Sequence, residues 1–234
     1  MFIFTPMALQ CDKYRLLGQF DPALDEQFVE LPQTRCDGST IFLHQQAADA
    51  FEQMAAKAGA DGIRMIAVSG FRSFERQQQI WNNKWTGTTL TQGMNLAETV
   101  AEPIERAKLI LRYSAMPGTS RHHWGTDLDI NSVEPAYFAT PEGEQLFAWL
   151  QEHAAGFGFA RPYTAKGLER PDGYEEEKWH WSYLPLSKPM LTVYNKSVSY
   201  LDLKGFLGAE TALKLGVIEN YVNGIHPACI QGEV

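Results

Sequence analysis

The sequence predicts an α+β fold, and three observations support this class. Helical and strand-like segments follow one another in mixed order, without the regular β-α-β succession that builds a parallel sheet. Hydrophobic residues make up 44% of the 234 residues and charged residues 21%, a balance typical of a globular protein with a sizeable core. No repeat or low-complexity linker divides the chain, so we expect one compact unit with a C-terminal tail.

The first clear elements are a helix and a strand. The helix is predicted over residues 45–58, which are rich in alanine, carry apolar residues at helical spacing and precede Gly59. The strand is predicted over residues 63–71, where branched and aromatic side chains are frequent, and it ends at Ser69 and Gly70. The chain therefore contains both helices and strands, as an α+β fold requires.

Three more helices are expected in the middle of the chain. Residues 75–85 have helical composition, and residues 103–113 have a proline in the first turn, where its missing N–H costs nothing. Thr140 can cap a third helix that begins with Pro141 and runs to about Ala155. These helices supply the layers that cover a small sheet.

The remaining elements are two short strands and a tail. Strands are predicted around residues 127–130 and 179–183. We expect residues 1–184 to form the main domain and residues 185–234 to form a mostly helical extension packed on it. Within this extension, the segment 206–222 has helical character.

The charge balance excludes some partners. The chain has 20 basic and 28 acidic side chains, a net charge of −8. This excess of acid argues against nucleic acid or an anionic membrane surface as the main partner. No apolar run reaches the roughly 20 residues that a bilayer-spanning helix needs.

The N-terminus and the cysteines favour a cytoplasmic location. The first residues, MFIFTPMALQC, have no Lys or Arg before the apolar stretch, so we interpret them as an ordinary N-terminus and not as a secretory signal. Cys11, Cys36 and Cys229 are widely spaced and form no C-x-x-C pair, which favours reduced thiols. One disulfide and a periplasmic location are the alternatives.

The segment SRHHWGTDLDI, residues 120–130, concentrates metal-ligand side chains. His122 and Asp129 are seven residues apart, so a uniform strand would point them to opposite faces. A turn at Trp124-Gly125-Thr126 would bring them together. Imidazole nitrogen and carboxylate oxygen both suit Zn²⁺, which takes about four ligands. Two ligands are too few, so a third must lie elsewhere.

The best candidate for the third ligand lies in EEEKWHWSY, residues 175–183. Glu177 precedes His180 by three residues, and at a strand end or bulge both can reach one metal region. A histidine ligand beside a glutamate suits metal-assisted hydrolysis, because the ion lowers the pKa of water toward ~7 and the carboxylate accepts its proton. Trp179 and Trp181 would shield the site from bulk water.

Together these motifs resemble one peptidase family. SRHHWGTDLD has the pattern S-x-H-x-x-G-x-x-x-D, EKWH has the pattern E-x-W-H, and SGFRSFERQ at 69–77 has the pattern S-G-[YF]-R-S. In this order they resemble VanY-like D-alanyl-D-alanine carboxypeptidases of the LAS group of zinc peptidases, over about residues 40–185. The resemblance implies a hedgehog/D-Ala-D-Ala-peptidase-like fold in which a small antiparallel sheet carries the metal site, and it makes 1–184 the zinc carboxypeptidase domain.

The resemblance also implies a role for each motif residue. One zinc ion would be held by three ligands: His122, Asp129 and His180. Glu177 would be the general base, and Arg72 would clamp the terminal carboxylate of the substrate with its planar guanidinium. Further substrate contacts are implied for Gln77, Ser120 and Tyr163.

The chain departs from the family pattern beside the metal ligands. Asp127 replaces the small residue commonly found two before the ligand aspartate, and His123 and Trp124 replace smaller polar residues. Asp127 would either orient a ligand histidine or reshape the pocket. His123 is adjacent to a ligand, and we expect it to be structural.

The leading functional hypothesis is a zinc carboxypeptidase that releases terminal D-alanine from peptidoglycan stem peptides. An L,D-carboxypeptidase that trims recycled tetrapeptides is favoured, because a cytoplasmic D,D-enzyme would destroy the pentapeptide needed for cross-linking. The alternatives are a D,D-carboxypeptidase and a non-catalytic, metal-stabilised module that binds cell-wall peptides, in which Glu177 is dispensable. A serine carboxypeptidase is disfavoured because S-x-x-K and G-x-S-x-G are both absent.

Overall fold

The protein is described by a computed structural model that covers residues 11–230. The predicted ordinary N-terminus falls mainly on residues 1–10, which lie outside the described residues. Within residues 11–230, no helix is both long enough and apolar enough to cross a membrane.

A four-stranded antiparallel sheet lies at the centre of the fold. Its strands are β3 (Ala67–Ser69), β4 (Asp127–Ile130), β5 (Phe159–Ala160) and β6 (His180–Tyr183), in the order β3-β4-β6-β5. The predicted strand over 63–71 is thus shorter than expected. The mixture of helices with small antiparallel sheets confirms the predicted α+β class.

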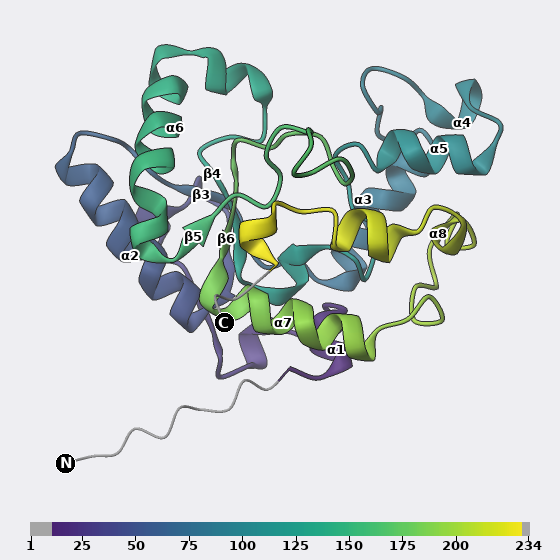
Figure 1. The fold of residues 1–234 in the computed structure, drawn as a ribbon, viewed down its shortest axis with the longest axis horizontal. Helices are drawn as coiled ribbons and strands as arrows, with labels where there is room; N and C mark the ends of the chain where they lie inside the picture. The colour runs from purple at the N-terminus through teal and green to yellow at the C-terminus, as the bar shows by residue number, and fades with distance from the viewer. Residues whose placement is uncertain (1–10, 231–234) are drawn as a thin grey trace.

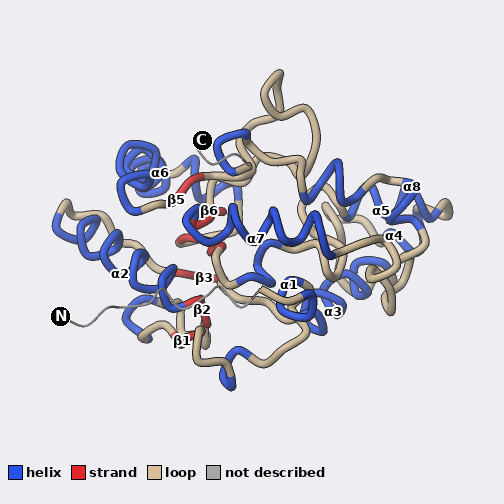
Figure 2. Tube along the Cα trace, turned by 60° about the horizontal axis from the view of Figure 1, so that its bottom comes forward, coloured by secondary structure: helices blue, strands red, loops and turns tan. Residues whose placement is uncertain are grey.

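Helices lie on two sides of this sheet (Figures 1 and 2). α2 (Gln45–Ala60) and α6 (Pro141–His153) lie on one side, and α3 (Phe74–Trp85) and α5 (Pro103–Ile110) lie on the other. These four helices occur where the sequence predicted them, with ends shifted by a few residues. The remaining strands form a two-stranded sheet, β1 (Phe28–Glu30) with β2 (Phe42–His44), and the remaining α-helices are α1 (Lys13–Leu16), α4 (Leu96–Thr99), α7 (Leu184–Ser197) and α8 (Thr211–Lys214).

The two faces of strand β4 have opposite character. Leu128 and Ile130 are fully buried in a hydrophobic cluster with Trp181 of β6 and with residues of α2 and α6. Asp127 and Asp129 alternate with them and therefore point to the other face. One face of the strand thus anchors the sheet in the core, and the other presents carboxylates.

The C-terminal part of the chain differs from its prediction. The helical character predicted for 206–222 is found in only part of that segment, in α8 and in a π-helical turn at Ile218–Val222. Gly216 lies between them with φ +57°, a left-handed conformation that ends the first helix. The longest helix of this region is α7, which was not predicted because its sequence contains Pro185 and Pro189.

We expect the substitution Leu128→Ala to lower the free energy of unfolding by about 2–5 kcal/mol, because it leaves a cavity at a fully buried position. Urea denaturation of the zinc-free protein measures this loss. Leu24→Ala is the control, since Leu24 is 86% exposed, and its effect is expected within about 0.5 kcal/mol. Equal stability of the two variants would contradict the assignment of this strand face to the core.

Candidate metal centre and substrate cavity

The fold brings the three predicted metal ligands together. Asp129 on β4 is paired directly with His180, the first residue of β6. His122 lies on a short 3₁₀ turn, Arg121–Trp124, that precedes β4. Gly125 ends this turn with φ +66°, and a Cβ there would lie 2.2 Å from the ring of Phe28. The turn expected between His122 and Asp129 therefore exists, and glycine is required in it.

Hydrogen bonds orient both histidine rings toward Asp129. Nδ1 of His122 lies 2.8 Å from the carbonyl oxygen of Gly70, and its Nε2 faces Oδ2 of Asp129 at 3.4 Å. Nε2 of His180 lies 2.9 Å from Oδ2 of Asp127, and its Nδ1 faces Oδ1 of Asp129 at 3.3 Å. Each ring thus uses one nitrogen as an anchor and presents the other to a common point.

This arrangement fits a divalent metal ion. The ligand atoms of His122, Asp129 and His180 all lie within 4.8 Å of one another, and all three residues are buried. Oδ1 of Asp129 is buried without a hydrogen-bond partner among the described residues. Burial raises the pKa of Asp129, but His122 and His180 outweigh burial and hold that pKa far below its usual range. Two imidazole nitrogens with an ionised carboxylate suit zinc.

Glu177 is the one member of its acidic run that faces the candidate metal site. Its Oε2 lies 3.3 Å from Nδ1 of His180, and the residue is only 7% exposed. Glu175 is paired instead with Arg112, and Glu176 with Arg161. The neighbouring acids are therefore occupied by ion pairs, whereas Glu177 lines the cavity.

Asp127 is the anchor of His180 and lies behind the site. Its Oδ2 accepts from Nε of Arg121 at 2.8 Å as well as from His180, and its Oδ1 accepts from Thr126 and Ser182. Burial raises the pKa of Asp127, but Arg121 and His180 outweigh it and keep the carboxyl ionised. Asp127 was predicted either to orient a ligand histidine or to reshape the pocket, and its direct contact with His180 agrees with the first of these roles.

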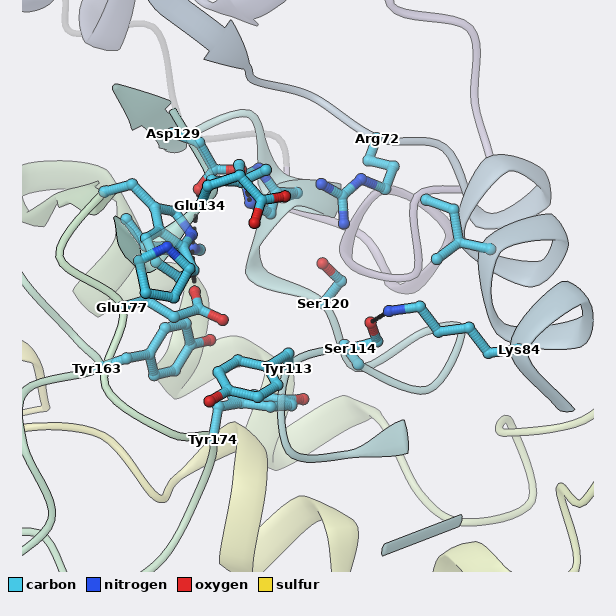
Figure 3. Close-up of a pocket in the computed structure, with 17 residues that line it drawn as sticks. Arg72, Lys84, Tyr113, Ser114, Ser120, Asp129, Glu134, Tyr163, Tyr174 and Glu177 are labelled. Atoms are coloured by element: carbon cyan, nitrogen blue, oxygen red, sulfur yellow. Dashed lines mark hydrogen bonds and ion pairs between the residues drawn. The ribbon is translucent and has the colours of Figure 1, made fainter. Parts of the chain in front are cut away.

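A cavity of about 470 Å³ opens in front of the candidate metal site. Figure 3 shows Asp129 and Glu177 on one side of it and Arg72 with Ser120 on the other. Arg72 donates to Oε1 of Gln77 at 2.9 Å and to Oγ of Ser69 at 3.0 Å. Both partners are neutral, so the guanidinium charge stays available to an anionic ligand.

The predicted substrate contact from Gln77 needs correction. Gln77 is fully buried and does not line the cavity. Its Oε1 accepts from Arg72, and its Nε2 donates to the carbonyl oxygen of Ala115 at 2.7 Å. Because the helix α3 places this side chain behind Arg72, Gln77 contacts the arginine and does not line the cavity.

Aromatic residues form the wall beside Glu177. The ring of Tyr163 packs edge-on against His180, with ring centroids 4.7 Å apart, and against Tyr174 at 5.0 Å. Ser120 and Tyr163 both line the cavity, as predicted for substrate contacts, and Tyr174 lines it as well. Tyr174 was not predicted, because it lies in an irregular loop without a recognisable motif.

His123 is structural, as expected from its position next to a ligand. It is fully buried, its Nδ1 lies 2.6 Å from the carbonyl oxygen of Arg72, and its Nε2 accepts from the backbone N–H of Gly118. Burial lowers the pKa of His123 to about 3, so the ring is neutral. The His123 ring ties the turn of the candidate metal ligand His122 to the backbone of Arg72.

Sequence reasoning missed several other residues of the site. Arg121 was missed because nothing in the sequence indicates that Asp127 forms an ion pair with it. Lys84 and Ser114 lie opposite the candidate metal site and are hydrogen-bonded to each other, and Glu134 projects over the cavity (Figure 3). Their positions depend on how separate loops and helices meet, which no local sequence pattern reports.

Comparison with known proteins identifies relatives over the same region. The model of the VanY family, D-alanyl-D-alanine carboxypeptidase, matches residues 40–186, more than half of the chain. The D-alanyl-D-alanine carboxypeptidase of Enterococcus faecalis is 34% identical over 153 residues, 65% of this chain and 51% of that protein. YodJ of Bacillus subtilis, whose name assigns it provisionally to the carboxypeptidases, is 30% identical over 190 residues, 76% of this chain and 59% of that protein.

A solved structure is similar as well. VanYB in complex with D-alanine-D-alanine is 26% identical, has a TM-score of 0.51 and is matched over 77% of this chain and 91% of that one. The chain spans only 51% to 59% of the length of the two curated relatives. The similarity therefore concerns one part of those proteins.

We expect Asp127→Asn to weaken zinc binding by about 10- to 100-fold, the usual effect of losing the partner of a ligand histidine. All four groups that contact Asp127 donate hydrogen bonds, and an amide nitrogen cannot accept any of them. Competition with a chromogenic chelator measures the affinity. Glu176→Gln removes a nearby acid that lies outside this network and should bind zinc like the wild type. Equal affinity of the two variants would show that Asp127 does not support the site.

Proposed function

The chain belongs to the VanY family of D-alanyl-D-alanine carboxypeptidases, as its motifs predicted, and we propose that it is a zinc-dependent carboxypeptidase that releases D-alanine from peptidoglycan stem peptides. One observation carries this proposal. A His-Asp-His site with an adjacent glutamate faces an arginine across a single cavity. The His-Asp-His site with its glutamate suits hydrolysis of a peptide bond, and the arginine suits recognition of the free carboxylate at the end of a peptide.

The residues divide the reaction between them. His122, Asp129 and His180 would hold zinc, which when bound lowers the pKa of water toward ~7 and polarises a carbonyl. Arg72 would bind the terminal carboxylate of the substrate through those guanidinium N–H groups that do not donate to Gln77 or Ser69.

Glu177 would move the proton. Its carboxylate would accept a proton from the attacking water and pass it to the amine of the departing D-alanine. Its place beside His180, at 3.3 Å from Nδ1, puts it next to the reacting groups. Tyr163 and Tyr174, both buried, would limit the access of bulk water to this region.

We expect Glu177→Gln to lower kcat by about 10²- to 10⁴-fold, because an amide cannot accept the proton. Zinc content should remain that of the wild type, since the side chain is close to isosteric and is not among the proposed ligands. Release of D-alanine from a tetrapeptide and a pentapeptide, normalised to bound zinc, is the measurement. Glu176→Gln is the matched control and should keep full activity. Full activity of Glu177→Gln would rule out Glu177 as the base, whereas no release of D-alanine by the zinc-loaded wild type would favour the binding-module interpretation.

The finer proposal is L,D-specificity, supported by charge complementarity at the cavity. Glu134 is exposed, lines the cavity and makes no ion pair within the described part of the chain. In a tetrapeptide, the residue before the terminal D-alanine is lysine, whose side chain ends in an ammonium group, or diaminopimelate, whose side chain ends in an ammonium group beside a carboxylate. In a pentapeptide that residue is D-alanine, which offers Glu134 only a methyl group. Trimming of recycled tetrapeptides agrees with the proposed cytoplasmic location.

A D,D-carboxypeptidase is the second candidate. The structure of VanYB in complex with D-alanine-D-alanine favours it, because that protein is 26% identical and matches most of this chain. The proposals share the same chemistry and differ only in the residue that precedes the scissile bond.

The ratio of two kcat/KM values distinguishes them. We expect the wild type to prefer the tetrapeptide, and Glu134→Gln to lower kcat/KM for the tetrapeptide several-fold while it leaves the value for the pentapeptide unchanged. A surface ion pair contributes about 0.2–1 kcal/mol, which corresponds to roughly 1.4- to fivefold, and we expect the change within this range. Preference of the wild type for the pentapeptide would favour the D,D-enzyme.

A further inference from the structure

The segment 218–229, near the C-terminal end of the described residues, packs against the loop 161–179 that carries Glu177. Figure 1 shows this yellow segment beside the green loop. We propose that the segment positions the loop, and with it Tyr163 and Glu177, for the reaction; this inference rests on the proposed function. The family match ends at residue 186, so the segment is an addition to the part of the chain that the family shares.

A chain of aromatic rings connects the segment to the metal site. Tyr221 packs on Tyr174 with centroids 5.2 Å apart, Tyr174 packs on Tyr163 at 5.0 Å, and Tyr163 packs on His180 at 4.7 Å. Such ring pairs favour definite mutual orientations. The outermost ring belongs to the segment and the innermost ring is a proposed ligand, so displacement of Tyr221 would loosen the wall of the site.

Backbone contacts fix the loop to the segment at two further points. Gly173 of the loop meets Gly224 of the segment so closely that a Cβ on Gly173 would lie 2.1 Å from the carbonyl oxygen of Gly224. The backbone N–H of His226 donates to the carbonyl oxygen of Pro162 at 2.9 Å, one residue before Tyr163. The segment therefore holds the loop near its start, at Pro162, and again at Gly173.

The loop needs such support because it contains neither helix nor strand. Its internal order comes from Arg170, a buried guanidinium that donates to the carbonyl oxygens of Asp172 and Tyr174 at 2.8 Å each. A single backbone bond, from Glu177 N–H to the carbonyl oxygen of Tyr163 at 3.0 Å, ties the base to the cavity wall. These contacts order the loop internally. Its position in the fold is set by Glu175, which is bonded to Arg112, and by the contacts with the segment described above.

The segment is itself firmly attached to the rest of the fold. The side-chain amides of Asn223 and Asn195 of α7 exchange hydrogen bonds of 3.0 and 2.8 Å. Val222, Ile225 and Cys229 are buried in the hydrophobic cluster that also contains Tyr163 and Tyr174. A segment anchored in this way can transmit its position to the loop.

The experiment compares three variants of the full chain loaded with zinc. Tyr221→Ala removes the outermost ring, Tyr221→Phe keeps the ring, and Leu213→Ala changes a residue of the same tail that is 66% exposed. The readouts are kcat and KM per bound zinc on the tetrapeptide and the pentapeptide, and amide hydrogen exchange of residues 161–179. We expect Tyr221→Ala to lower kcat per bound zinc at least tenfold and to speed exchange in the loop, while Tyr221→Phe and Leu213→Ala match the wild type.

The outcomes separate this inference from the proposed function. If the wild type hydrolyses a peptide and Tyr221→Ala keeps its kcat per bound zinc, the positioning role is overturned, even where the variant is less stable. If neither peptide is hydrolysed by the zinc-loaded wild type, the proposed function fails, and the exchange data alone decide the inference. In that case, loop exchange in Tyr221→Ala equal to the wild type overturns it, and faster exchange confined to residues 161–179 supports it.

Discussion

The pairing register of β4 with β6 is the constraint on which the site depends. It sets Asp129 opposite His180 and Asp127 opposite Ser182, so that four polar side chains share one face of the sheet. Leu128 and Trp181 are paired on the other face and hold the strands in the core. A slip of one residue would exchange these faces and bury the carboxylates in the hydrophobic cluster. The apolar packing therefore specifies the geometry of the polar site.

Burial of charge is the second constraint, and it explains why the site extends beyond its ligands. An ionised carboxylate in the interior is costly unless every oxygen is satisfied. Asp127 meets this condition through Arg121, whose guanidinium also donates to Ser182 and lies over the ring of Trp124. Asp129 is left with one oxygen, Oδ1, that accepts no hydrogen bond within the described residues. The contrast between the two aspartates agrees with a structural role for Asp127 and a candidate metal-ligand role for Asp129.

Much of the site could be predicted from sequence, because its ligands lie in short local motifs. The spacing of His122 and Asp129 around Gly125 requires a turn, and the position of Glu177 before His180 sets it apart from its acidic neighbours. Gln77 shows where such reasoning ends, since helix α3 decides whether its side chain faces the cavity or lies behind Arg72. The tail was the least predictable part: α7 forms although its sequence contains two prolines, and the left-handed conformation of Gly216 interrupts a segment of helical composition.

The contact between Gly173 and Gly224 has a consequence for how such chains can diverge. Two glycines that touch through their backbones leave no room for a side chain on Gly173, so neither the loop nor the tail can be exchanged alone for that of a relative. A chimaera that joined this catalytic core to a foreign C-terminus would have to rebuild both partners at once. The loop 161–179 and the segment 218–229 are therefore expected to change together in evolution, although the two glycines are 51 positions apart in the sequence (224 − 173).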